Sequence, residues 1–133
     1  MKFTLDTNMI SYLLKGDRDI LEKLQNAIIS GDKFVINPIV FYEVYRGLLY
    51  KKASEQLKRF QQYCNQFDSC GVCQQTFITA AEIYSNLREK GKLIDDADIF
   101  IAAVCIQNGH VLITNNEKHF KRINKLKILN WIL

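Results

Sequence analysis

The chain alternates short apolar runs with longer segments of helical periodicity, and the connections between them are only a few residues long. Runs typical of strands cover residues 1–5, 33–36 and 110–114, and weaker ones cover 70–73 and 126–131. Helical spacing covers 8–30, with a break near Gly16, and then 38–52, 53–67, 76–89 and 95–106, and a short helix follows through His119 and Phe120. Parallel strands need crossovers of this kind, so the alternation predicts an α/β fold with a mainly parallel sheet covered on both faces.

The composition fits one domain spanning residues 1–133. Hydrophobic residues make up 48% of the chain, and one Pro and six Gly leave no room for a flexible linker. Asp6 interrupts the first apolar run before a signal peptide can form, and no apolar run reaches the ~20 residues of a membrane span. We therefore expect a soluble, cytoplasmic protein that makes no membrane contact.

Basic residues gather in three groups along the chain. The net charge is +4, from 18 basic and 14 acidic residues, which is compatible with a polyanionic partner without requiring one. Each group is either the solvated face of a helix or part of a surface that holds a polyanion. The groups are Lys51, Lys52, Lys58 and Arg59; Arg88, Lys90 and Lys92; and Lys118, Lys121, Arg122, Lys125 and Lys127.

Four cysteines invite a search for metal or redox chemistry. Cys70 and Cys73 have the spacing of half a zinc site, but a second pair of ligands is missing from the sequence. Cys64 and Cys105 stand alone, and neither histidine has ligand spacing to any cysteine. A redox pair would place its first cysteine at a helix N-terminus, whereas this pair falls in a predicted strand or turn. The sequence therefore favours buried, reduced cysteines.

Asp6 occupies the point where the first strand stops and a helix begins. In open α/β sheets, ligands bind at this kind of junction. Asp is also a common helix cap, so Asp6 alone does not decide between the two roles. The strand at 110–114 repeats the pattern, since it ends on Asn115 and Asn116, although such a pair also suits a turn.

Glu43 lies early in the helix that Asn37 and Pro38 are expected to open as cap and first helical residue. Its neighbours in the sequence are mostly apolar. A carboxylate on such a helix faces solvent, pairs with a cation or holds a metal. Arg46, three residues later, is close enough to form an ion pair with Glu43.

Asp98 directly precedes eight apolar residues, a run that is apolar on every side of the helix and therefore predicts burial. Asp95 or Asp96 can be explained as the cap and the first-turn acid. Asp98 shares a helical face with apolar residues, so it should point partly into the interior. Three acids in four positions repel one another, which destabilises the fold unless a cation lies between them.

Strand ends and helix starts meet at one edge of a parallel sheet, so we expect Asp6, Glu43, Asp98 and Asn116 to form one acidic pocket, with Asp96 as a further candidate. Oxygen ligands without imidazole or thiolate neighbours suit Mg²⁺ or Mn²⁺. With a phosphodiester bound, one or two such ions can activate a water and stabilise the leaving oxygen. The outer lysines and arginines would then hold the polyanion.

Four motifs, in this order and spacing, resemble those of the PIN-domain ribonucleases, and most closely the VapC-type toxins of bacterial toxin–antitoxin pairs. The motifs are Leu-Asp-Thr-Asn at 5–8, Glu43 after the second strand, Asp-Ala-Asp-Ile-Phe-Ile-Ala-Ala at 96–103 and Leu-Ile-Thr-Asn-Asn at 112–116. The resemblance covers essentially the whole chain and implies a three-layer α/β/α sandwich with four or five strands. It assigns metal binding to Asp6, Glu43 and Asp98, and an accessory role to Asp96.

The resemblance also implies further site residues and partners. Thr7 and Thr114 match hydroxyl positions near the metal, and Asn116 stands where many members have a fourth Asp, which bears on whether one or two ions bind. Such toxins usually form homodimers, and a small antitoxin holds them inactive in a higher assembly. The candidates for that contact, which can equally be core residues, are Tyr12, Leu13, Phe41, Tyr45 and Leu49.

Two other function classes remain open. One is a PIN fold that has lost catalysis and only binds RNA or protein. Its sole support is Asn116, which stands where many members have the fourth Asp. A receiver or a phosphatase with a similar sheet needs acids in other places; one class of phosphatase would have a second Asp where Asn8 stands. The sequence therefore predicts a Mg²⁺- or Mn²⁺-dependent endoribonuclease that acts on RNA as the toxin of such a pair.

Overall fold

Five strands form one parallel sheet, in the order β3-β2-β1-β4-β5, in the computed structural model, which describes residues 1–132. The strands are β1 (Lys2–Leu5), β2 (Lys33–Ile36), β3 (Asp68–Ser69), β4 (Val111–Ile113) and β5 (Ile128–Leu129). The helices are α1 (Thr7–Leu14), α2 (Arg18–Ile29), α3 (Pro38–Tyr50), α4 (Ser54–Gln66), α5 (Gln74–Glu89), α6 (Asp96–Asn108) and α7 (Glu117–Phe120). The predicted α/β class and parallel sheet are confirmed, with the larger of the two expected strand numbers.

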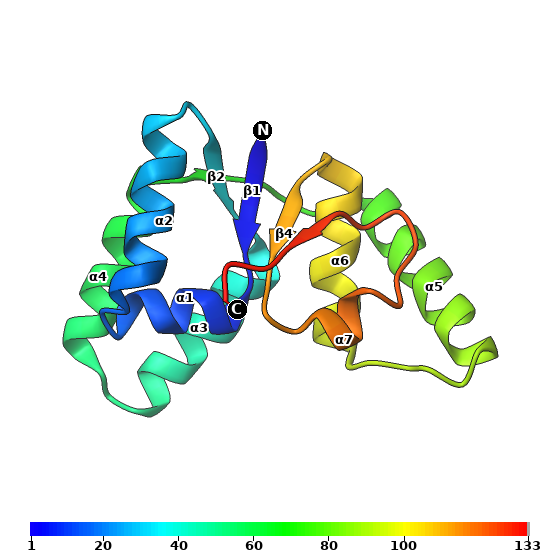
Figure 1. Ribbon diagram of the computed structural model, residues 1–133. Helices are drawn as coiled ribbons and strands as arrows, with labels where there is room; N and C mark the ends of the chain where they lie inside the picture. The colour runs from blue at the N-terminus through cyan, green and yellow to red at the C-terminus, as the bar shows by residue number, and fades with distance from the viewer. Residues whose placement is uncertain (133) are drawn as a thin grey trace.

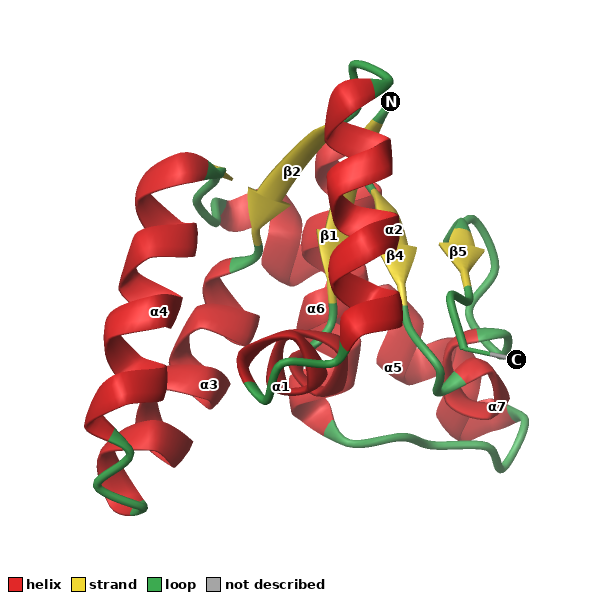
Figure 2. Ribbon diagram, turned by 60° about the vertical axis from the view of Figure 1, so that its left-hand side comes forward, coloured by secondary structure: helices red, strands yellow, loops and turns green. Residues whose placement is uncertain are grey.

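The sheet lies between two layers of helices. Figure 1 shows α2 and α4 on one side of the sheet and α5 and α6 on the other. Figure 2, turned by 60°, shows α2 in front of β1 and β4 while α6 lies behind them. The three-layer arrangement is therefore confirmed. Among residues 1–132, no helix combines the length and the hydropathy that a membrane span requires.

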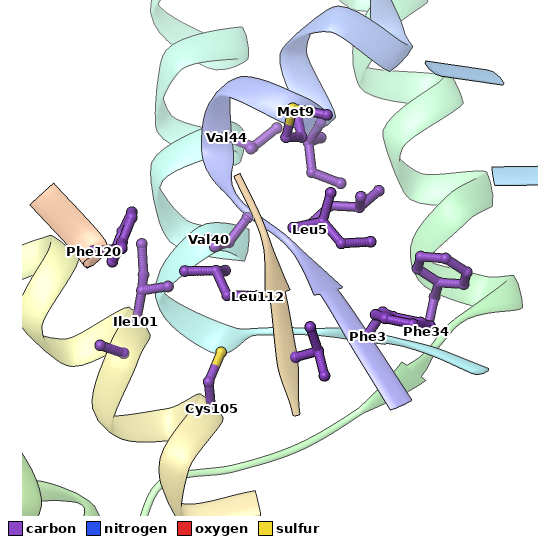
Figure 3. Packing of buried hydrophobic residues seen from close by; sticks show 14 of the residues in the cluster. Phe3, Leu5, Met9, Phe34, Val40, Val44, Ile101, Cys105, Leu112 and Phe120 are labelled. Carbon is purple, nitrogen blue, oxygen red and sulfur yellow. The ribbon is translucent and has the colours of Figure 1, made fainter. Parts of the chain in front are cut away.

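The core forms where the central strand β1 meets both layers (Figure 3). Phe3 and Leu5 of β1 are buried, as are Leu112 of β4 and the inner residues of α6. The apolar run that begins at Ile99 accounts for this position of α6, since six of its residues are less than 3% exposed. Burial of α6 fixes its first turn against the sheet, and that turn carries Asp98.

The register of the central strands brings the ends of β1 and β4 together. Leu5 pairs with Ile113, and the next residue, Asp6, donates its backbone N–H to the carbonyl of Ile113 at 3.0 Å. The side chains of Asp6 and Thr114 therefore come side by side just beyond the ladder, although they are 108 residues apart in sequence.

The structure corrects the prediction of a strand at 70–73. The third strand is Asp68–Ser69, which pairs with Val35 and Ile36 of β2 at the edge of the sheet. Its two residues are exposed and polar, because an edge strand this short is held by backbone pairing rather than by side-chain burial. The final strand is the opposite edge, as predicted, but it covers only Ile128–Leu129.

The cysteines are less buried than the sequence suggested. Cys105 is fully buried, Cys64 and Cys70 are half-buried, and the expectation of burial is wrong for Cys73, which is exposed. Cys73 caps α5, which therefore begins two residues earlier than predicted; its backbone N–H donates to the hydroxyl of Thr76 at 3.1 Å.

Candidate active site

Asp6 is both a helix cap and a buried carboxylate at the carboxyl edge of the sheet. It is the N-cap of α1, and its Oδ1 accepts a hydrogen bond from the backbone N–H of Met9 at 2.9 Å. Its Oδ2 accepts a hydrogen bond from the hydroxyl of Thr114, which is fully buried. The capping role is confirmed, and the role in ligand binding stays a prediction.

The environment of Asp6 disfavours its charged form. Burial raises the pKa of this carboxyl from 3.8 to about 6, against the lowering effect of the hydrogen bonds from Thr114 and Met9. The negative charges of Asp98 and Glu43 raise the pKa further. Asp6, Asp98 and Glu43 therefore lie close enough to act on one another electrostatically, although they come from three separate elements.

Glu43, on the second turn of α3, leans towards α1. Its Oε1 accepts a hydrogen bond from the hydroxyl of Thr7 at 2.7 Å. Its Oε2 lies 3.7 Å from Nη2 of Arg46, the i,i+3 pair that the sequence suggested. The side chain of Glu43 is 18% exposed, compared with 58% for Arg46, so the carboxylate is largely buried while the guanidinium extends into solvent.

Asn37 holds the helices of Glu43 and Asp98 together. The residue is fully buried; its Oδ1 caps α3 through the N–H of Ile39 at 3.0 Å, and its Nδ2 donates to the carbonyl of Ile101 in α6 at 3.1 Å. The capping role was predicted. The bond to α6 was not, because sequence spacing carries no information on a contact over 64 residues.

Asp98 is half-buried at the start of α6. Burial raises the pKa of this carboxyl, and so do the negative charges of Glu43 and Asp95, whereas His119 lowers it. The Nδ1 atom of His119 lies 3.7 Å from Oδ2 of Asp98. The sequence analysis did not identify His119 as a site residue. Its position in the short helix that Asn116 caps, three residues after Asn116, was the signal available.

Asn116 reaches the site through Thr114 and His119. Its backbone N–H donates to the hydroxyl oxygen of Thr114 at 2.9 Å, and its Nδ2 lies 3.0 Å from Nδ1 of His119. Thr114 therefore links the backbone of Asn116 to the carboxylate of Asp6. Of the two hydroxyl positions that the resemblance suggested, Thr114 supports Asp6 and Thr7 supports Glu43.

The structure places Asp96 away from the other acids. Asp96 is exposed and lines a groove between α5 and α6, beside Phe77, Tyr84 and Phe100. Two residues along a helix correspond to a rotation of about 200°, so Asp96 and Asp98 face nearly opposite directions. The structure thus brings Asp6, Glu43 and Asp98 together and leaves the expected accessory acid outside.

The residues of this pocket fit a hard divalent cation in their chemistry. The three acids offer oxygen donors, and their mutual repulsion raises the pKa of Asp6 and Asp98, a penalty that a bound cation would relieve. Among residues 1–132, no three side chains of His, Cys, Asp or Glu lie close enough together to form a metal site.

Comparisons with known proteins agree on one family. The PIN domain model matches residues 3–126. Ribonuclease VapC2 from Rickettsia felis is 31% identical, with 98% of each chain covered. Ribonuclease VapC1 from Methanocaldococcus jannaschii is 32% identical over 93% of this chain and 82% of its own. The chain in the crystal structure of VapBC2 from Rickettsia felis, bound to a DNA fragment from their promoter, superposes with a TM-score of 0.91 at 26% identity, covering 99% of this chain and 100% of that one.

Proposed function

The chain belongs to the PIN-domain family as a VapC-type member, and on this premise we propose that it is a Mg²⁺- or Mn²⁺-dependent endoribonuclease acting as the toxin of a toxin–antitoxin pair. One observation carries the proposal: Asp6, Glu43 and Asp98 come from three elements to the carboxyl edge of the sheet, where burial raises the pKa of Asp6 to about 6 and the charges of Asp98 and Glu43 contribute to the rise. Acids gathered in this way suit a divalent cation and, through it, a phosphodiester.

When bound, the cation would activate a water and stabilise the oxygen that leaves the phosphate. The residues of the chain hold the carboxylates in position. Thr114 and the N–H of Met9 hold both oxygens of Asp6, and Thr7 holds one oxygen of Glu43. Such outer contacts orient metal ligands and limit their freedom before the metal arrives. Each carboxylate oxygen keeps a second lone pair with which to bind the cation.

RNA is the proposed substrate, and the names of the relatives support a ribonuclease. A small cognate antitoxin is the proposed partner, supported by the VapBC2 complex from Rickettsia felis. Phe41 and Leu49 are 40% and 55% exposed and are available for that contact, whereas Leu13, at 4%, belongs to the core. We propose that the protein acts in the cytoplasm as a homodimer, and in a higher assembly with its antitoxin.

The test is cleavage of labelled RNA by the purified protein, with Mn²⁺ or with EDTA. Asp98→Asn should lower the rate by about 100-fold or more, because it removes one charged oxygen ligand while it keeps the shape of the side chain. Asp96→Asn is the matched control, since it makes the same change two residues away, outside the pocket. Asp96→Asn should retain cleavage, and both variants should keep the far-ultraviolet circular dichroism of the wild type.

Equal cleavage by the wild type and Asp98→Asn would refute the nuclease assignment. RNA binding without cleavage, under all metal conditions, would instead support the non-catalytic PIN fold that Asn116 left open. Growth arrest when the wild type is expressed without a partner, absent for Asp98→Asn, would support the toxin role.

A further inference from the structure

Two basic groups that are well separated in the sequence meet beside the candidate active site. Arg122, just after α7, donates from Nη1 to the carbonyls of Lys92 and Leu93 at 3.2 and 3.3 Å. These bonds attach the loop between α5 and α6, residues 90–95, to the α7 region. Figures 1 and 2 both show this loop running beside α7.

Both segments lead to Asp98. The loop ends at Asp95, the N-cap of α6, three residues before Asp98. From the other side, α7 carries His119, whose Nδ1 lies 3.7 Å from Oδ2 of Asp98, and Lys118 is the residue before it. The joined loop and helix therefore flank one side of the acidic pocket.

We call the exposed lysines of these two segments, Lys90, Lys92 and Lys118, the basic ridge. Within residues 1–132, these three lysines take part in no ion pair. Their neighbour Lys121 differs, since its Nζ lies 3.6 Å from Oε1 of Glu117. The ridge thus offers ammonium groups that are not already neutralised.

We propose that the basic ridge binds the phosphates of the RNA strand on one side of the scissile phosphate, and that Arg122 keeps its two segments together. This inference rests on the proposed function. A pocket of carboxylates repels a polyanion, so the strand needs compensating charge within about one Debye length, ~10 Å at 0.1 M salt. Lys118 adjoins His119, and Lys92 lies in the loop that leads to Asp95, so the ridge would meet phosphates on the side of the site where His119 approaches Asp98.

The experiment compares two double variants that remove the same charge. Lys92→Gln/Lys118→Gln changes the ridge, and Lys51→Gln/Lys52→Gln changes an exposed pair at the end of α3. Each lowers the formal net charge by two from +4. Binding of a fluorescein-labelled single-stranded RNA is measured by anisotropy in EDTA, without cleavage, from about 50 to 200 mM KCl.

The ridge variant should bind RNA more weakly and with less salt dependence. Each lost phosphate contact lowers the salt slope by ~0.7, so two contacts lower it by ~1.4. Across this fourfold salt range, the wild type should then lose about sevenfold more affinity than the ridge variant does. The control pair should keep the slope and the affinity of the wild type.

Equal effects of the two double variants would show that only net charge matters and would overturn the proposal. An unchanged RNA affinity of the ridge variant, with weaker binding of the cognate antitoxin, would make the ridge a protein contact and would also overturn it. Because binding is measured without catalysis, these outcomes are distinct from failure of the nuclease assignment. In Mn²⁺ the ridge variant should show a raised KM and an almost unchanged kcat.

Discussion

Asp6→Asn is expected to stabilise the metal-free protein at neutral pH while it abolishes cleavage. Asp6 is 5% exposed, and burial, together with the charges of Asp98 and Glu43, raises its pKa from 3.8 to about 6. One pKa unit corresponds to about 1.4 kcal/mol, so the ionised carboxylate lowers the free energy of unfolding by up to about 3 kcal/mol.

The direction in which stability changes with pH follows from proton binding. Between about pH 4 and pH 6 the folded protein holds the proton of Asp6 more tightly than the unfolded chain does. The stability that protonation contributes is therefore complete below pH 3.8 and is lost as the pH rises through about 6. Asn has no charge to bury at any pH, so the variant should lack this part of the pH dependence.

Asn also retains both hydrogen bonds of the native side chain. Its Oδ1 can accept from the N–H of Met9, and its Nδ2 can donate to the hydroxyl oxygen of Thr114, which also accepts from the N–H of Asn116. The hydroxyl hydrogen of Thr114 then loses its acceptor, which offsets part of the gain. We expect Asp6→Asn to be more stable than the wild type by about 1–3 kcal/mol at pH 7.5, or roughly 4–10 °C in Tm. At pH 4 the difference should nearly vanish.

The assay is urea and thermal unfolding in EDTA at several pH values between 4 and 8, with Asp96→Asn as the control. That residue is exposed, so the control should stay within about 0.5 kcal/mol of the wild type. Excess Mn²⁺ should stabilise the wild type, by about 2.7 kcal/mol at 100 times its Kd, and should have little effect on Asp6→Asn. A variant with the wild-type pH dependence, or one less stable at pH 7.5, would refute the reasoning.

Three further outcomes are expected. Thr114→Val removes the hydroxyl that donates to Asp6. In urea unfolding at pH 7.5, this variant should have a free energy of unfolding lower than that of the wild type by about 1.5–3 kcal/mol. A smaller loss of stability at pH 7.5 than at pH 4 would contradict this. Iodoacetamide should alkylate Cys73 first, since hydrogen bonds at the start of α5 lower the pKa of this exposed thiol. Cys105 should react last, since burial raises its pKa to about 12. Peptide mass spectrometry reports the order of alkylation, and equal rates would count against it. Arg122→Ala should speed amide hydrogen exchange in the loop that precedes α6 while α6 itself stays protected; unchanged exchange in the loop would mean that the two carbonyl bonds do not restrain it.

The elements that bury many apolar side chains were predictable. The strands that contain Phe34 and Leu112 include continuous apolar runs because both faces of the sheet are covered, and α6 is apolar on every side for the same reason. In the first strand, Phe3 and Leu5 alternate with Thr4. The strand at Asp68–Ser69 carries no such pattern, since it lies at an edge and pairs only through its backbone. The weak strand predicted at 70–73 is wrong, and Val72 within that range is 46% exposed.

The candidate site was predictable only in part. Asp6, Glu43 and Asp98 could be placed at one edge because each follows a strand end or opens a helix, and the order of elements in a parallel sheet brings such positions together. Asp96 was a further candidate because it also opens a helix and matches an accessory acid of the family, but the rotation of the helix turns it to another groove. His119 and Asn37 contribute through contacts over 21 and 64 residues, for which local spacing gives no signal.

The sequence by itself determined the helices and the apolar strands, because hydrophobic periodicity and capping are local properties that a single strand or helix expresses alone; it did not determine the edge strand at Asp68–Ser69. Only the tertiary structure decided which carboxylate is buried, which hydroxyl holds it and how far its pKa rises. Those quantities depend on desolvation and on charges across space, and both arise only when segments distant in the chain have packed together.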